Sequence, residues 1–321
     1  MFAKEGKIGR AVGPGVLLVL LTALISGVST FVNAYGVQGM NSDAFVTVRN
    51  LTVAAMLVPL AVLARGSLRR SIRRRDWARL LVIGFIGGFV PFLLFFHGLQ
   101  MATGAGGATT ASFGYRTLFL MATVLGVVFL RERLSARTAL AAGLLLAGNF
   151  LLLAVTSPVW TDGTAFVLLA TAMWAGEYTL SKRTLRDLSP GTVALARMGI
   201  GGLFLTAYLG LTGQFGAVAA LSGPQWQWVA LSALLLLAFV TTWYAGLKQV
   251  DVSVATAVLV LGFPITFALE VLVRNRAFTA GQAAGAVAIV FGVALAIGLA
   301  SMKGTWIYLA KAVRSRIRSG T

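Results

Sequence analysis

Ten long apolar stretches follow one another along this chain of 321 residues, and they constrain its fold more than any other feature. A helix that crosses the hydrocarbon core of a bilayer needs about 20 consecutive apolar residues. Only 11% of the residues are charged, against about 25% in a soluble domain. The sequence therefore predicts an all-α membrane protein with ten transmembrane helices. The predicted spans are 14–36, 44–64, 77–101, 106–130, 136–156, 163–181, 191–213, 226–247, 253–273 and 280–300.

Lysine and arginine are distributed very unevenly between the two sides of such a bundle. An even number of spans puts both termini on one side, which holds 22 of these residues, while the other side holds two and the spans hold three. By the positive-inside rule both termini are predicted to be cytoplasmic. The net charge of +18 and the run RRSIRRRD (69–76) are therefore interpreted as topology signals rather than as a nucleic-acid surface.

The two halves of the chain repeat one another. FFHGLQ (95–100) matches WYAGLK (243–248), and FLRERLSA (129–136) matches LVRNRAFTA (272–280). Five spans per copy is an odd number, so the copies insert in opposite orientations, as in transporters whose halves enclose a central cavity near the midplane. The predicted domains are a first five-helix repeat, a second one, and a basic cytoplasmic tail, at 1–156, 157–302 and 303–321.

Several classes of protein are disfavoured by what the sequence does not contain. It has no cysteine, one histidine, nine acidic residues, no Walker loop and no HExxH motif. These residues offer little from which to build a membrane enzyme or a metal centre. We therefore expect no enzymatic activity, no cofactor and no metal, and transport that runs downhill or on a gradient. A membrane scaffold that transports nothing remains the alternative from a different class.

Charged residues inside the spans indicate function, because charge is costly in a bilayer. Arg116 and Glu177 lie deep in their spans. Either they form a buried structural pair with each other or with backbone groups, or they flank a wet cavity and attract the two ends of a zwitterion. Arg49 and Arg197 lie near the span ends, where snorkelling to the surface is the alternative to a buried role.

A stripe of mixed aromatic and polar residues runs along the predicted sixth span. Trp174, Glu177, Tyr178 and Ser181 share one helix face, because residues three and four apart lie over one another. Lipid does not solvate a carboxylate, so this face is interpreted as part of the lining of a cavity. A stripe of this kind suits an amino acid that carries a ring.

The remaining candidate positions come from the ends of other spans. His97, the only histidine, either holds the substrate, relays protons or is a core residue. The full set of predicted cavity residues is Asn33, Tyr35, His97, Tyr115, Arg116, Trp174, Glu177, Tyr178, Ser181, Trp243 and Tyr244. Hinges are predicted at Pro91, Gly262 and Pro264, because proline removes a helical hydrogen bond and kinks the helix.

These motifs carry a family resemblance over essentially the whole chain. FLRERLSA, followed by the glycine-rich AAGLLLAGNFLLL, resembles the signature of the EamA-type drug/metabolite transporter superfamily. HGLQ and AGLKQV are similar to segments of that family too. The second copy departs from the pattern, since Asn275 is expected to stand where the family has an acidic residue.

Within that superfamily, the aromatic inner segments look most like the YddG-type aromatic amino acid exporters of bacteria. The resemblance implies export of aromatic and other neutral amino acids across the inner membrane, by alternating access or facilitated diffusion. The implied partners are a small-molecule substrate and the lipid bilayer, with no nucleic acid. The alternative within the same fold is an exporter of aromatic or cationic drug-like compounds.

Overall fold

In the computed structural model, the described residues are 13–36, 39–63, 73–155 and 157–298, and every regular element among them is an α-helix. The predicted basic tail lies outside these residues. The helices are α1 (Pro14–Gly36), α2 (Ser42–Leu63), α3 (Arg74–Gly88), α4 (Val90–Gly104), α5 (Ala108–Arg116), α6 (Leu118–Leu130), α7 (Ala136–Leu153), α8 (Asp162–Thr184), α9 (Pro190–Leu211), α10 (Phe215–Ala219), α11 (Gly223–Leu247), α12 (Val252–Leu259), α13 (Gly262–Arg274) and α14 (Ala280–Ile297).

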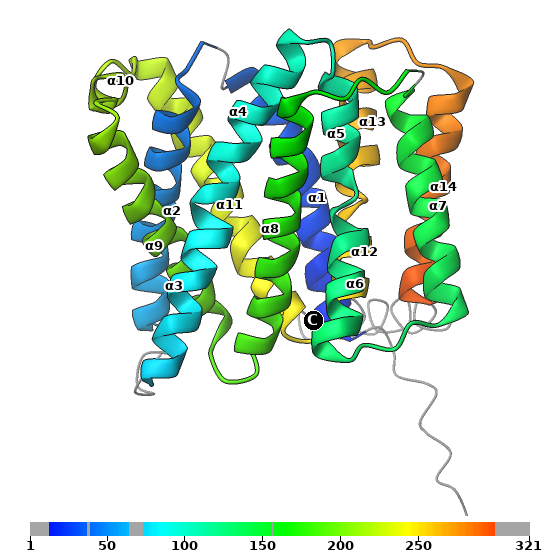
Figure 1. Cartoon of the computed structure of the whole chain (residues 1–321), viewed down its shortest axis with the longest axis horizontal. Coiled ribbons are helices and arrows are strands. Elements are labelled where there is room, and N and C mark those ends of the chain that lie inside the picture. Colours follow the sequence, from blue (N-terminus) through cyan, green and yellow to red (C-terminus); the bar gives the residue numbers. More distant parts are fainter. Residues whose placement is uncertain (1–12, 37–38, 64–72, 156, 299–321) are drawn as a thin grey trace, which may run out of the picture.

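Nine segments of the described chain are long and apolar enough to cross a membrane. Three of them join two helices end to end, namely α3 with α4, α5 with α6, and α12 with α13. The tenth expected span corresponds to α8, which is not one of the nine. Its face of buried polar residues, which includes Glu177 and Ser181, makes it less apolar than its neighbours, although it runs the height of the bundle in Figure 1.

The first helices of the two halves run in opposite directions. In Figure 1, α1 rises from the lower edge of the bundle, whereas α8 descends from the upper edge. The loops 131–135, 185–189 and 248–251 all lie at the lower edge, which we call the basic end because it carries the described arginine- and lysine-rich loops.

Glycines let helices from the two halves approach closely. A Cβ on Gly148 of α7 would lie 2.8 Å from the carbonyl oxygen of Gly285 of α14, and one on Gly27 of α1 would lie 2.8 Å from that of Gly262. Such small-residue contacts let helix backbones pack without lipid between them. The glycines at the α7–α14 and α1–α13 contacts therefore serve packing.

Proline explains two of the three helix breaks. Pro264 has no amide to donate to the carbonyl of Val260, and α12 stops there; Phe263 N donates to that carbonyl instead, at 3.0 Å. Pro91 sits just after the break at Phe89 between α3 and α4. The break between α5 and α6 has no proline, and falls at Thr117, whose side chain donates to the carbonyl of Gly114.

The structure corrects the register of the repeat at the family signature. Arg131 and Asn275 each end a helix in the left-handed conformation, at φ 58° and 53°. They are therefore equivalent, and the counterpart of Glu132 is Arg276 rather than Asn275. The alignment of the two repeats from the sequence was offset by one residue, because both turns contain two arginines separated by one residue.

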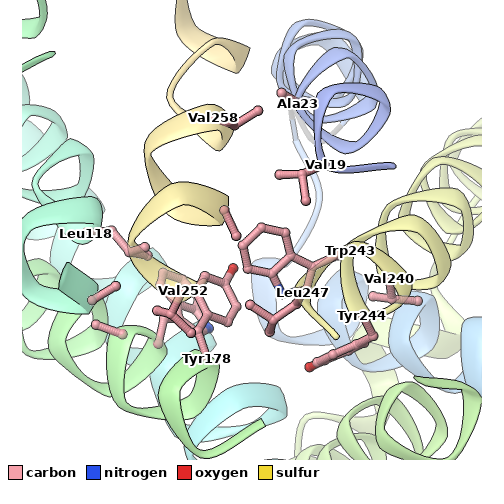
Figure 2. Close-up of a cluster of buried hydrophobic side chains, with 14 of the residues drawn as sticks. Val19, Ala23, Leu118, Tyr178, Val240, Trp243, Tyr244, Leu247, Val252 and Val258 are labelled. Atoms are coloured by element: carbon pink, nitrogen blue, oxygen red, sulfur yellow. The ribbon is translucent and has the colours of Figure 1, made fainter. Parts of the chain in front are cut away.

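The largest hydrophobic core joins the two halves around Trp243. Figure 2 shows its ring among side chains from α1, α8, α11 and α12, including Val19, Tyr178 and Val252. Tyr178 and Trp243 have ring centroids 4.6 Å apart. Both residues are packed core in this conformation.

Candidate substrate site

A cluster of aromatic rings lies midway along the bundle, centred on Trp174 of α8. Its ring centroid is 5.4 Å from that of Phe92, 5.5 Å from Phe95 and 5.6 Å from Tyr115. These rings come from α4 and α5, next to the breaks that begin α4 and end α5. The structure thus brings two of the predicted site residues together, Tyr115 and Trp174, with phenylalanines that the sequence did not single out.

Arg116 ends α5 beside this cluster. Its guanidinium carbon lies 4.1 Å from the centroid of the Phe263 ring, which belongs to α13. Its Nη1 is buried and has no hydrogen-bond partner in the described part of the chain. Arg116 is therefore not the structural partner of Glu177, which was one alternative from the sequence.

Glu177 is instead the centre of a buried polar network. Its Oε1 accepts hydrogen bonds from Ser181 Oγ and, at 2.8 Å, from Tyr244 OH. Its Oε2 lies 3.4 Å from Arg197 Nη1. The side chain of Glu177 is 0% exposed and that of Arg197 5% exposed, so the snorkelling alternative for Arg197 is wrong. The carboxylate has one cation and two hydroxyls around it.

Arg197 also connects this network to the break before α4. Its Nε donates to the carbonyl oxygen of Gly87 at 3.2 Å, and Trp174 Nε1 donates to the same oxygen at 3.2 Å. In an uninterrupted helix that oxygen would accept from residue 91, which is a proline. Gly87 also lets Glu177 approach, since a Cβ there would lie 2.5 Å from Glu177 Cγ.

Arg49 is the third buried guanidinium, and its snorkelling alternative is wrong as well. Only 6% of the residue is exposed. Its guanidinium carbon lies 5.2 Å from the ring centroid of Phe45 and 5.4 Å from that of Phe92. Its Nε and Nη2 each donate a long hydrogen bond of 3.4 Å to Asn50 Oδ1. Through Phe92, it borders the aromatic cluster from the α2 side.

Three predicted residues lie toward the end opposite the basic end. His97 Nε2 is 3.2 Å from Asp43 Oδ2, and 43% of the histidine side chain is exposed. Asn33 donates to Ser29 Oγ at 3.3 Å. Tyr35 lies in α1, and its side chain is outside the described residues. Neither His97 nor Asn33 forms a hydrogen bond or ion pair with the aromatic cluster in the described structure, and no group of metal-binding residues occurs among those described.

Comparison with known proteins addresses the chain as a whole. The model of the EamA-like transporter family matches residues 13–154 and again residues 162–298. The chain belongs to the EamA-like transporter family. A solved crystal structure with 20% sequence identity covers 90% of this chain and 100% of its own, with a TM-score of 0.71, which shows a shared fold. No curated protein matches.

Membership confirms the family expected from the signature segments, and with it a membrane transporter of small molecules built from two repeats. In this EamA-like chain, the signature glutamate Glu132 holds the repeats together at the basic end. Its carboxylate accepts from Val252 N at 2.6 Å and from Ser253 N and Oγ at 3.1 and 2.7 Å. It thereby caps α12, which belongs to the other repeat.

Gly126 and Lys182 lie beside this contact, and each of them interacts within its own EamA repeat. A Cβ on Gly126 would lie 2.8 Å from Glu132 Oε2, so the glycine makes room for the carboxylate. Lys182 Nζ donates to the carbonyls of Leu247, Lys248 and Val250, at the end of α11. A cation is favourable at the C-terminus of a helix. Reasoning from the sequence missed the Glu132 cap and the Lys182 contact, because their partners are 120 and 65 residues away along the chain.

A pocket of about 320 Å³ opens beside this contact. Its lining is mostly charged, and consists of Leu130, Arg131, Glu132, Arg133, Lys182, Arg186 and Asp251. Burial, and secondly the charge of Glu132, raise the pKa of the Asp251 carboxyl above its ordinary value, against the opposing effect of Lys182. The charge of Glu132 thus disfavours the ionised form of Asp251.

Proposed function

We propose that this EamA-like protein is a secondary transporter that exports small solutes with an aromatic body, aromatic amino acids among them, from the cytoplasm. The observation that carries the proposal is the ring cluster around Trp174, which lies between two helix breaks near the middle of the bundle. Transporters bind substrate at interrupted helices between their repeats. Aromatic rings arranged edge to face offer the same contacts to an incoming ring.

The orientation follows from charge. We assign the basic end to the cytoplasm by the positive-inside rule, with α8 as the tenth crossing and both termini cytoplasmic. The polar face of α8 points into the protein, where Glu177 and Ser181 are fully buried. This helix can therefore cross the membrane without being apolar on every side. The bacterial inner membrane remains the location that the resemblance implies, and the repeats are assigned to 1–156 and 157–302.

Alternating access requires contacts that form and break between the repeats. At the basic end, we assign this role to the Glu132 cap on α12, which joins the two repeats on the side that we assign to the cytoplasm. The helix breaks next to Pro91 and Pro264 allow the α3–α4 and α12–α13 segments to bend. Gly262, at the start of α13, is the third predicted hinge residue. Rocking of one repeat against the other then alternates access to the aromatic cluster.

The test uses purified protein in liposomes loaded with unlabelled L-phenylalanine, and measures uptake of labelled L-phenylalanine. Saturable exchange that falls strongly in Trp174→Ala supports the proposal. The matched control is Trp77→Ala, because Trp77 is 50% exposed at the start of α3, outside the cluster. A panel of cationic aromatic drugs tests the alternative substrate class. Absence of exchange for every aromatic solute contradicts the proposal and leaves the scaffold alternative.

A further inference from the structure

The charges buried inside the bundle do not balance. In the described chain, the formally charged side chains buried between the two ends of the bundle are Arg49, Arg116 and Arg197 and the single carboxylate of Glu177. Only Arg197 and Glu177 form an ion pair. Cations at membrane depth are costly without a counter-charge. The bundle therefore has a deficit of negative charge around its aromatic cluster.

Glu177 does not present a free carboxylate to a substrate amine. It is 0% exposed; its Oε1 accepts from Tyr244 and Ser181, and its Oε2, which accepts no hydrogen bond in the described chain, lies 3.4 Å from Arg197 Nη1. Gly87 of α3 packs against the Cγ of Glu177. An ammonium group that entered the cluster would have to displace a guanidinium to reach it. The sequence-based expectation that Glu177 binds the amine of a zwitterion is therefore not the one that this geometry favours.

Arg116 is in the opposite situation. Its Nη1 is buried and without a hydrogen-bond partner in the described residues, and no described carboxylate lies within ion-pair distance of it. One face of the guanidinium is covered by the Phe263 ring. The adjacent Tyr115 stacks edge-on to Trp174 and Phe263. A guanidinium offers a planar fork of donors that matches a carboxylate.

From these three observations we infer that the site recognises an aromatic solute by one carboxylate, held by Arg116, and gives an α-amino group no partner. The inference rests on the proposed function and narrows its substrate class to aromatic and aryl-alkyl monocarboxylates. Arg49, which borders the cluster through Phe92, adds to the positive potential. A buried ammonium left without a partner weakens binding, so deaminated aromatic acids are preferred over the corresponding amino acids.

The test compares four ligands of one shape on the full-length protein in nanodiscs, by direct binding. They are 3-phenylpropionate, L-phenylalanine, 2-phenylethylamine and 3-phenylpropanol. We expect 3-phenylpropionate to bind about tenfold more tightly than L-phenylalanine, which corresponds to about 1.4 kcal/mol. We expect the amine to bind most weakly. Arg116→Gln should weaken the acid about tenfold or more and leave the alcohol unchanged.

Arg274→Gln is the matched control, because Arg274 lies at the end of the bundle opposite the basic end and interacts with the Glu270 side chain. It should leave all four affinities unchanged. Arg116→Lys keeps the charge without the fork and serves where Arg116→Gln does not fold, as judged by its thermal midpoint; it should weaken the acid and spare the alcohol. Equal or tighter binding of the amine or the amino acid, or an acid affinity that survives the Arg116 substitutions, overturns the inference while the proposed function stands. If none of the four ligands binds, the proposed function itself fails.

Discussion

The Nε of Arg197 donates a hydrogen bond of 3.2 Å to the carbonyl oxygen of Gly87. That oxygen is available because Pro91, four residues later, has no amide to offer it. Trp174 shares the same acceptor. A gap in one helix is thus filled by side chains from α8 and α9, which connects the bend between α3 and α4 to both the aromatic cluster and the buried ion pair.

Replacing Pro91 by alanine is expected to slow transport. The new amide competes for the Gly87 carbonyl, and so weakens two side-chain hydrogen bonds worth about 0.5–1.5 kcal/mol each. It also straightens α3 into α4. The measurement is the exchange rate of labelled solute in liposomes. Pro59→Ala is the control, since Pro59 lies inside α2 and is exposed. Equal rates for the two variants would refute the link.

Glu177→Gln is expected to lower stability rather than to change selectivity. Loss of the carboxylate leaves the Arg197 guanidinium buried without its counter-charge, which costs about 3–5 kcal/mol. The thermal midpoint in detergent measures this effect. A double variant, Glu177→Met with Arg197→Met, removes both charges and should recover much of the loss. A stable Glu177→Gln protein that loses its preference among charged aromatic ligands would contradict this prediction.

Removing the signature carboxylate is expected to open the basic end. In Glu132→Gln the amide replaces a carboxylate acceptor, and each hydrogen bond to a charged group contributes about 1.5–3 kcal/mol. The chain has no cysteine, so a single Leu130→Cys probe, in the wall of the pocket beside this contact, reports accessibility without background. We expect faster labelling of this probe from the basic end when Glu132→Gln is added. Glu270→Gln, at the opposite end, should leave the labelling rate unchanged.

Stability should depend on pH through Asp251. Its pKa is raised in the folded protein, because burial and the nearby Glu132 disfavour the ionised form. The folded state therefore binds this proton more tightly than the unfolded chain does. The stabilisation is present at pH values below the unfolded pKa and is lost as pH rises through the folded pKa.

The comparison of thermal midpoints between the wild-type protein and Asp251→Asn checks this dependence. An asparagine cannot ionise, so the variant should become relatively more stable as pH rises from about 4 to about 8, the range above the ordinary Asp pKa. Asp162→Asn, at the start of α8 at the opposite end, serves as the control. A difference between the two proteins that does not change with pH would show that Asp251 does not contribute.

Much of the architecture could be read from local sequence. Each span is a continuous apolar run, because a bilayer demands that roughly 20 residues of one helix be apolar. The break near Pro264 also follows from local sequence, because proline lacks the amide that would bond to the carbonyl four residues earlier. The Glu270–Arg274 ion pair is local as well, because residues four apart on one helix lie over one another. α8, the tenth predicted span, is not among the nine segments that its apolarity would identify as a membrane crossing.

The partners of the buried charges were decided only by the tertiary structure. Glu177 accepts from Tyr244, 67 residues away, and Glu132 from Ser253, 121 residues away. A sequence shows that such a carboxylate needs a partner, because burial without one is costly. The sequence alone does not show which arginine pairs with Glu177. Arg116 was one expected partner, and the structure has Arg197 instead. Only the packing of α3 against both α8 and α9, at Gly87 and Gly88, selects the pair and leaves Arg116 facing the aromatic rings.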